Sequence, residues 1–167
     1  MRKEKELFIN RLDRLGKGER SALRRAAGIM LQDADGSALV AFYKCVPFKV
    51  EKWQEPRWFA VACLSCLWDS SSIEGKPLEH IIKEMVRTEI LSASTTHRVE
   101  ILLDTKWDED GYMLTKLVRI IRLIRQKADS GQPDFISLLD DLLFWNSETQ
   151  SVQRKWARTI FANIGKE

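Results

Sequence analysis

The spacing of the apolar residues most constrains the fold, because they recur every three or four positions along almost the whole chain. That spacing matches the turn of an α-helix, and the alternating pattern of a half-buried strand is hard to find. Glycine and proline stand almost only between the periodic segments, where helices begin and end. The sequence therefore predicts an all-α fold, a compact bundle of seven to eight helices with short connections.

The expected helices are delimited by candidate caps. Ser37, Asp134 and Ser147 are predicted N-caps of helices, and Ser21 is the predicted cap of a short turn that Gly28 closes in the left-handed conformation. The predicted segments are 4–15, the short turn 22–27, 38–43, 57–68, 77–85, 94–103, 113–127, 135–145 and 152–164. Segment 57–68 is apolar nearly all round, so it should be the buried centre of the domain.

The 167 residues suffice for one domain with a core that needs neither metal nor disulfide. We expect a single all-helical domain over 1–167, or two packed halves that meet near 70–76 or 128–133. Three cysteines, an odd number, argue against a disulfide framework and for a reducing compartment. No apolar stretch approaches a membrane span, and no signal peptide is visible, so the expected location is the cytoplasm.

Groups that carry catalysis are scarce. His80 and His97 are isolated, and Cys63 and Cys66 lie on the apolar helix, where they are expected to be core residues. No phosphate-binding loop, nucleophile elbow or zinc-protease motif is present. We predict a protein without enzymatic activity, cofactor or metal. A carboxylate metal site within 104–110 stays open as the enzyme alternative.

The tryptophans divide into two groups. Trp58, Trp68, Trp145 and Trp156 lie on helical seams and are expected in the core. Trp53 and Trp107 lie in predicted loops, where an indole could stack on a nucleobase.

The charge distribution is more informative than the net charge of +3. The helix expected at 113–127 has an apolar arc, and its remaining face holds bases without acids: Lys116, Arg119, Arg122 and Lys127, with Arg125 at the boundary. The last helix repeats the pattern, with Arg154, Lys155 and Arg158 opposite its apolar seam. Solvated helices usually mix signs, and arginine binds phosphate with two donors. With the Arg24-Arg25 pair, these faces favour a surface that contacts nucleic-acid backbones independently of sequence.

Several segments in a fixed order resemble one family. They are Ala22-Leu23-Arg24-Arg25-Ala26, then Ala41-Phe42-Tyr43-Lys44 ending at Pro47, then Pro133-Asp134-Phe135 with Leu138-Leu139, Leu142-Leu143 and Trp145-Asn146, and finally Val152 to Arg158 around Trp156 and on to Phe161. Their order and spacing over almost the whole chain are similar to those of the small subunit of the type I-E CRISPR Cascade complex, the CasB family. Thr95 and Thr96, where the family tends to place an acid, and Gln153, where it often has a base, depart from the pattern.

The resemblance implies an all-helical, non-enzymatic cytoplasmic subunit, present in two head-to-tail copies beside other Cascade subunits. It implies contacts with crRNA, target DNA and the displaced strand that stabilise the R-loop, an antiviral role. Residues at matching positions are Arg24, Arg25, Arg57, Lys76, Arg98, Arg119, Arg154 and Arg158. The charge argument alone adds Lys83, Lys116 and Arg122. The alternative is a helical protein–protein adaptor, in which acidic faces around Asp134, Asp140 and Asp141 dock on basic ones.

Overall fold

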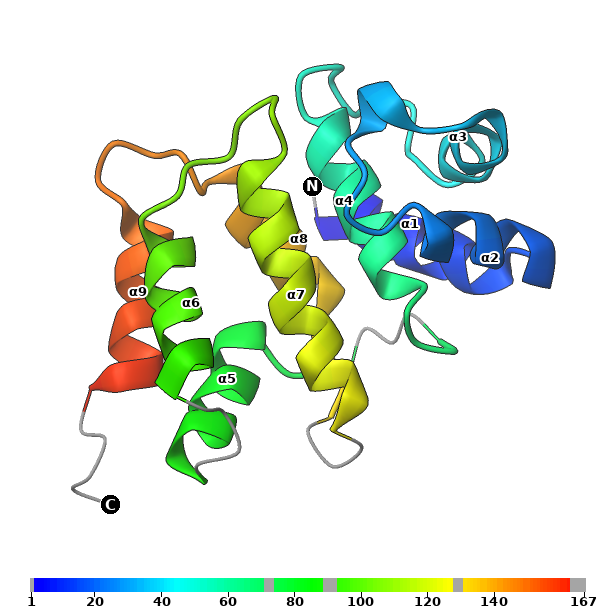
Figure 1. Ribbon diagram of the computed structural model, residues 1–167. Coiled ribbons are helices and arrows are strands. Elements are labelled where there is room, and N and C mark those ends of the chain that lie inside the picture. Colours follow the sequence, from blue (N-terminus) through cyan, green and yellow to red (C-terminus); the bar gives the residue numbers. More distant parts are fainter. Residues whose placement is uncertain (1, 71–73, 89–92, 128–130, 163–167) are drawn as a thin grey trace.

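The computed structural model describes residues 2–70, 74–88, 93–127 and 131–162, and these residues form a helical body (Figure 1). The elements are α1 (Arg2–Arg14), α2 (Lys17–Arg25), the 3-10 turn η1 (Leu31–Asp33), α3 (Gly36–Tyr43), α4 (Glu55–Ser65), α5 (Leu78–Arg87), α6 (Ala93–Leu103), α7 (Tyr112–Gln126), α8 (Phe135–Leu143) and α9 (Ser151–Phe161). The all-α prediction is confirmed, with nine α-helices in the described ranges rather than seven or eight. None of these helices is long and apolar enough to cross a membrane.

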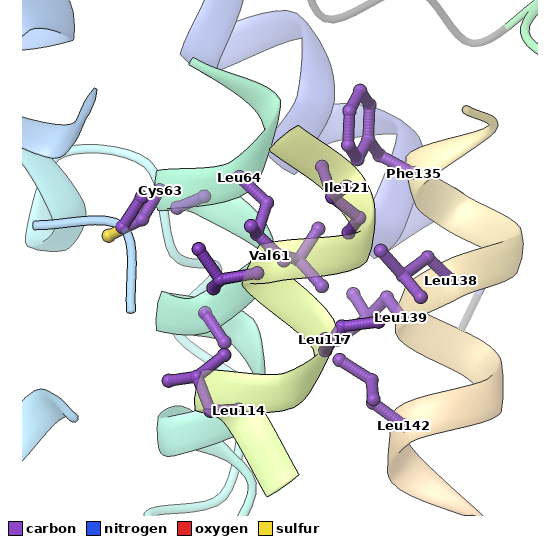
Figure 2. Packing of buried hydrophobic residues seen from close by; sticks show 14 of the residues in the cluster. Val61, Cys63, Leu64, Leu114, Leu117, Ile121, Phe135, Leu138, Leu139 and Leu142 are labelled. Atoms are coloured by element: carbon purple, nitrogen blue, oxygen red, sulfur yellow. The ribbon is translucent and has the colours of Figure 1, made fainter. Parts of the chain in front are cut away.

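Helix α4 is the buried centre of the molecule, as its all-round apolar sequence predicts. Every residue from Trp58 to Ser65 is buried. One side of α4 packs against α7 and α8, and Figure 2 shows Leu64, Leu117 and Leu139 from these three helices pointing into a shared core. Cys63 points away from that core and is still buried, so both sides of α4 are covered by protein.

The predicted helix starts are only partly right. Asp134 caps α8, since its Oδ1 accepts from the amides of Ile136 and Ser137 at 3.0 and 3.1 Å. Ser21, Ser37 and Ser147 are not the caps. Helix α2 already begins at Lys17, which puts Ser21 inside it. Helix α3 contains Ser37 and is capped by the carboxylate of Asp35, which accepts from the amide of Ala38 at 2.9 Å.

Other boundaries differ by a few residues. Helix α9 begins after Gln150, which is in the left-handed conformation at φ 52°, and not after Ser147. Helix α6 spans Ala93–Leu103, so it begins one residue before the predicted start at 94. Gly28 has φ 93°, which confirms its predicted left-handed conformation. The predicted end of the last helix at 164 lies outside the described residues.

The two loops predicted as places where the chain could divide are bonded to each other. The amide of Lys76 donates to the carbonyl of Gln132 at 2.9 Å, and the amide of Asp134 donates to the carbonyl of Lys76 at 2.7 Å. Gly75 is required at this crossing, because a Cβ atom there would lie 2.4 Å from the carbonyl oxygen of Pro133. The entry to α5 is therefore fixed against the entry to α8.

Candidate nucleic-acid interface

Helix α7 presents a row of cations along its exposed side. Its predicted apolar arc is confirmed by the burial of Met113, Leu114, Leu117, Ile120, Ile121 and Ile124. Lys116, Arg119, Arg122 and Arg125 follow at intervals of three residues. Three residues turn an α-helix by about 300°, so this row climbs about 13 Å and moves half a turn around α7. It crosses the exposed side from one edge of the buried arc to the other, and we call these four residues the α7 row.

The first end of the α7 row meets α6. Arg98, Ile101, Lys116 and Arg119 line a hollow of about 30 Å³ between the two helices. The ammonium of Lys116 lies 4.0 Å from the ring centroid of Tyr112, a cation–π contact that positions it at this hollow. The space is far below that of an organic ligand pocket, but three cations at its rim suit a single phosphate group. The structure thus brings together three of the predicted residues from two helices.

The other end of the α7 row meets the segment that follows α4. Arg125 Nε donates to the carbonyl of Leu67 at 2.8 Å, and Arg24 Nε donates to the carbonyl of Cys66 at 2.9 Å. A third arginine, Arg20, donates through Nη2 to the carbonyl of Trp68 at 2.9 Å. Carbonyls at and beyond a helix C-terminus lack partners within the helix, and cations there also oppose its dipole. Part of the basic character of α2 and α7 therefore stabilises the end of α4.

The turn that follows α2 packs against α7 and the loop that precedes α7. A Cβ at Gly28 would lie 3.7 Å from the Val118 side chain, and one at Gly111 would lie 2.8 Å from Cγ of Met30. Gln32 Nε2 donates to the carbonyl of Glu109 at 3.0 Å across the same contact. The exposed Arg25, the last residue of α2, thus directly precedes the turn that contacts α7.

Arg57 has a structural position. Its Nε donates to the carbonyl of Leu142 at 2.8 Å, and its guanidinium lies 5.2 Å from the ring centroid of Trp107. Burial lowers the pKa of this guanidinium. Trp107 is only 8% exposed, and Asn146 bonds both its amide and its carbonyl. The open possibility that Trp107 stacks on a base is therefore wrong, since its ring is covered by protein.

The remaining predicted residues lie apart from the α7 row. Lys76 has an exposed side chain beside the α5 entry, and Lys83 is half-buried on α5. Arg154 and Arg158 are exposed on α9, which packs against α5.

Lys155, between the two exposed α9 arginines, is engaged by acids of other helices. Its ammonium lies 2.6 Å from Asp141 Oδ1 and 3.4 Å from Glu79 Oε2, and both carboxylates are buried. Trp156 Nε1 donates to the second oxygen of Asp141 at 2.8 Å. Burial raises the pKa of Asp141 despite these donors. Burial alone would lower the pKa of Lys155, but the hydrogen bond and charges of Asp141 and Glu79 outweigh it and raise that pKa.

The acidic residues of the adaptor alternative are also engaged within the protein. Asp134 caps α8, Asp141 is buried against Lys155 and Trp156, and Asp140 pairs with the buried ammonium of Lys5. These three acids therefore do not form a free docking face.

Two further sequence expectations concern cysteine and metal chemistry. Cys63 and Cys66 are buried, as predicted, and burial raises the pKa of both thiols, which disfavours the reactive thiolate. Among the described residues, no three side chains of His, Cys, Asp or Glu gather in a way that could hold a metal ion. Gln153 is buried, and its Nε2 donates to the carbonyl of Trp145 at 2.6 Å, so this departure from the family pattern lies in the core.

Sequence reasoning placed Arg125 at the boundary of the basic face without including it among the site residues, and it missed Arg20. The three-residue spacing of the α7 row, which Arg125 completes, is the signal that could have included it. Arg20 is only 8% exposed, and no sequence pattern predicts its position. The groups to which it donates include the backbone carbonyls of Leu12 and Trp68, and every residue carries such a carbonyl.

Comparison with known proteins gives a consistent result. Residues 19–161 match a family model described as CRISPR-associated protein Cse2. A curated CRISPR-associated protein Cse2 from Thermus thermophilus is 32% identical over 161 residues, which cover 93% of this chain and 89% of that protein. A crystal structure of a Cse2-family protein, also from Thermus thermophilus, matches with a TM-score of 0.76 and 28% identity, over 94% of this chain and 97% of the other. A chain in a structure described as a CRISPR RNA-guided surveillance complex shares the fold, with a TM-score of 0.74, 20% identity and coverage of 98% and 95%.

Proposed function

Since the chain belongs to the Cse2 family of CRISPR-associated proteins, we propose that it is a non-catalytic subunit of a cytoplasmic RNA-guided surveillance complex of the Cascade type. In this role it contacts the phosphates of crRNA and target DNA and of the displaced strand. It works beside the other subunits of the complex and beside a second copy of itself. A solved chain with the same fold comes from a complex of this kind, which supports the proposal.

The observation that carries the nucleic-acid part is the convergence of Arg98, Lys116 and Arg119 on one small hollow. Like charges gathered from two helices repel one another, so their proximity costs free energy unless an anion occupies the site. A phosphate group offers the oxygens that guanidinium and ammonium groups bind best. Contacts with phosphates carry no sequence information, which suits a subunit that must accept every guide and target.

Such contacts can decide whether an R-loop persists. Replacing a DNA duplex by an RNA–DNA heteroduplex is nearly balanced in free energy, so a few protein–backbone contacts tip the exchange. The α7 row supplies four cations over about 13 Å of helix. Lys116 and Arg119 share the first hollow with Arg98, and Arg122 and Arg125 extend the basic surface along the helix. The other predicted residues, Arg24, Arg25, Arg57, Lys76, Lys83, Arg154 and Arg158, stay candidates for contacts elsewhere on the strands.

Membership of the complex is tested by co-purification. A tagged chain expressed with its neighbouring subunits and a guide RNA should elute with the RNA, in two copies per complex as measured by native mass spectrometry. Elution of the chain free of RNA-bearing material would contradict the proposal.

The phosphate site is tested by replacing its cations. Arg98→Ala with Lys116→Ala should weaken binding of a short single strand or duplex by roughly tenfold or more at moderate salt, since the loss of two cations releases fewer counterions on binding. Arg14→Ala with Lys17→Ala removes the same charge at exposed positions outside the α7 row and is the matched control. Equal affinities for the two double variants would place the phosphates elsewhere.

A further inference from the structure

A second, larger hollow lies where the α7 row ends. It has a volume of about 420 Å³, and its walls come from the segment after α4, the end of α7 and the entry to α8. Five of its lining residues carry an aromatic, charged or amide side chain: Trp68, Asp69, Arg125, Lys127 and Gln132. The space is in the range of pockets that hold small organic ligands, whereas the hollow beside Arg98 has about 30 Å³. The two hollows therefore suit ligand groups of different size.

Three of the side chains that line this hollow are held by contacts within the protein. Arg125 is held by its bond to the carbonyl of Leu67, and Gln132 Nε2 donates to the carbonyl of Ser70 at 2.7 Å. Trp68 packs edge-on against the buried Phe135, with ring centroids 5.7 Å apart. The Arg125 guanidinium lies 5.9 Å from the centroid of Trp68. A ligand would lose little free energy to the ordering of these side chains.

The groups on the walls have a common chemistry. Indole and guanidinium planes are the surfaces on which unpaired bases stack in nucleic-acid complexes. Asp69 and Gln132 carry oxygens of the kind that accept from amino groups on a base edge. Lys127 is an exposed cation at the rim, which suits the phosphate attached to such a base.

We propose that this hollow binds one unpaired nucleobase of the strand whose phosphates follow the α7 row. The inference rests on the proposed function, because Arg125 is both the last cation of the row and a wall of the hollow. A strand that follows the α7 row from Lys116 to Arg125 reaches the hollow at its far end. Within a duplex the base planes are covered by their neighbours, so the hollow selects for a nucleotide that is out of the stack.

The test compares a short DNA duplex that carries one bulged 2-aminopurine with the same duplex fully paired, using the full-length chain. The wild-type chain should bind the bulged duplex about tenfold more tightly, since stacking of one base on an aromatic side chain has effects of this order. Binding should also quench the fluorescence of 2-aminopurine. Trp68→Leu should abolish the preference and the quenching, and Trp68→Phe should restore both in part.

Controls separate this inference from the proposed function. Trp53→Leu removes an indole that is 58% exposed and lies outside the hollow, so it should leave preference and quenching unchanged. Arg125→Lys keeps the charge but loses the planar guanidinium, and it should reduce the preference even if Trp68→Leu fails to fold. Equal wild-type binding of both duplexes would overturn the base site and leave the phosphate contacts standing. Binding of neither duplex would overturn both.

Discussion

Helices α7 and α9 look alike in sequence and differ in the folded protein. Both have an apolar seam and a face of lysine and arginine without an acid on the same helix. In α7, Lys116 and Arg119 meet Arg98 of α6 at a hollow. In α9, Lys155 is bound by buried Asp141 and Glu79 from α8 and α5. The same local pattern thus forms a convergence of like charges on one helix and an ion-pair network on the other.

The difference shows that the partners of a basic face are set by the helices packed against it. The basic side chains of a helix face without acids have no ion-pair partner at the i,i+4 positions, but they can pair with an acid of a neighbouring helix. Buried carboxylates need a donor, and Lys155 and Trp156 supply three contacts to Asp141 and Glu79. The α7 row faces no such carboxylate in any described contact, which is why we assign phosphate binding to α7 before α9.

The largest expected effect is a loss of stability caused by a substitution in α9. Trp156 is fully buried, packs against Trp145 with ring centroids 5.3 Å apart, and donates to Asp141. Trp156→Ala should lower the free energy of unfolding by about 3–5 kcal/mol, because it leaves a cavity and removes a donor from a buried carboxylate. Chemical denaturation measures this loss. An unchanged unfolding midpoint would mean that α9 is not held through this residue.

Lys155→Met should have a smaller effect that depends on pH. The substitution leaves Asp141 and Glu79 without their cation. We expect it to lower the free energy of unfolding by about 1–3 kcal/mol near neutral pH, since the Lys155 side chain is 48% exposed and water screens both pairs. Burial already raises the pKa of Asp141, and loss of the cation raises it further. A carboxyl with a raised folded-state pKa stabilises the fold most below its unfolded pKa and loses this contribution as pH rises through the folded value.

The deficit in the free energy of unfolding of Lys155→Met relative to wild type should therefore shrink as the pH falls from 7.5 to about 4.5. Denaturation curves of both proteins across this range provide the measurement. A deficit that stays constant would show that the network does not respond to protonation of Asp141. Lys17→Met, at an exposed position outside this network, is the control and should show no such trend.

Measurements of nucleic-acid binding should distinguish the role of α7 from that of α9 directly. Arg119→Ala with Arg122→Ala should weaken DNA binding by roughly tenfold or more, while Arg154→Ala with Arg158→Ala should weaken it by roughly two- to threefold. All four side chains are exposed, so neither double variant should change the free energy of unfolding by more than about 1 kcal/mol. Equal losses in filter binding would remove the distinction between the α7 row and α9.

The smallest expected effect concerns how α9 begins. Ser147 is not its N-cap, so Ser147→Ala should change the free energy of unfolding by less than about 0.5 kcal/mol. Asp134 does cap α8, and Asp134→Ala should cost about 1 kcal/mol. A loss at Ser147 as large as that at Asp134 would show that the loop before α9 depends on its hydroxyl.

The sequence predicted the parts of the molecule that periodicity determines. The buried centre at α4 and the seam of α7 follow from the apolar pattern alone, because helical spacing decides which side of a helix faces the core. The helix starts were harder to predict, since Asp35 and Ser37 are both good caps and only the backbone chooses between them. The burial of Trp107 was missed because Arg57 and Asn146, which hold it, are distant in sequence.

For the candidate site, the sequence identified basic faces but not their partners. Lys155 looked equivalent to Arg154 and Arg158, because nothing along the chain indicates that Asp141 and Glu79 reach it. The meeting of Arg98 with Lys116 likewise depends on how α6 packs against α7. Contacts between elements distant in sequence decide which cations stay available, and a single sequence does not display them.

The central claim, that the α7 row contacts phosphates, is tested most directly by the salt dependence of DNA binding. The slope of log K against log salt reports how many phosphates a protein neutralises, at about 0.9 per contact on duplex DNA. Arg119→Ala with Arg122→Ala should reduce the magnitude of this slope by about 2, while Arg14→Ala with Lys17→Ala leaves it near the wild-type value. A slope unchanged by the α7 substitutions, with the fold intact, would contradict the account.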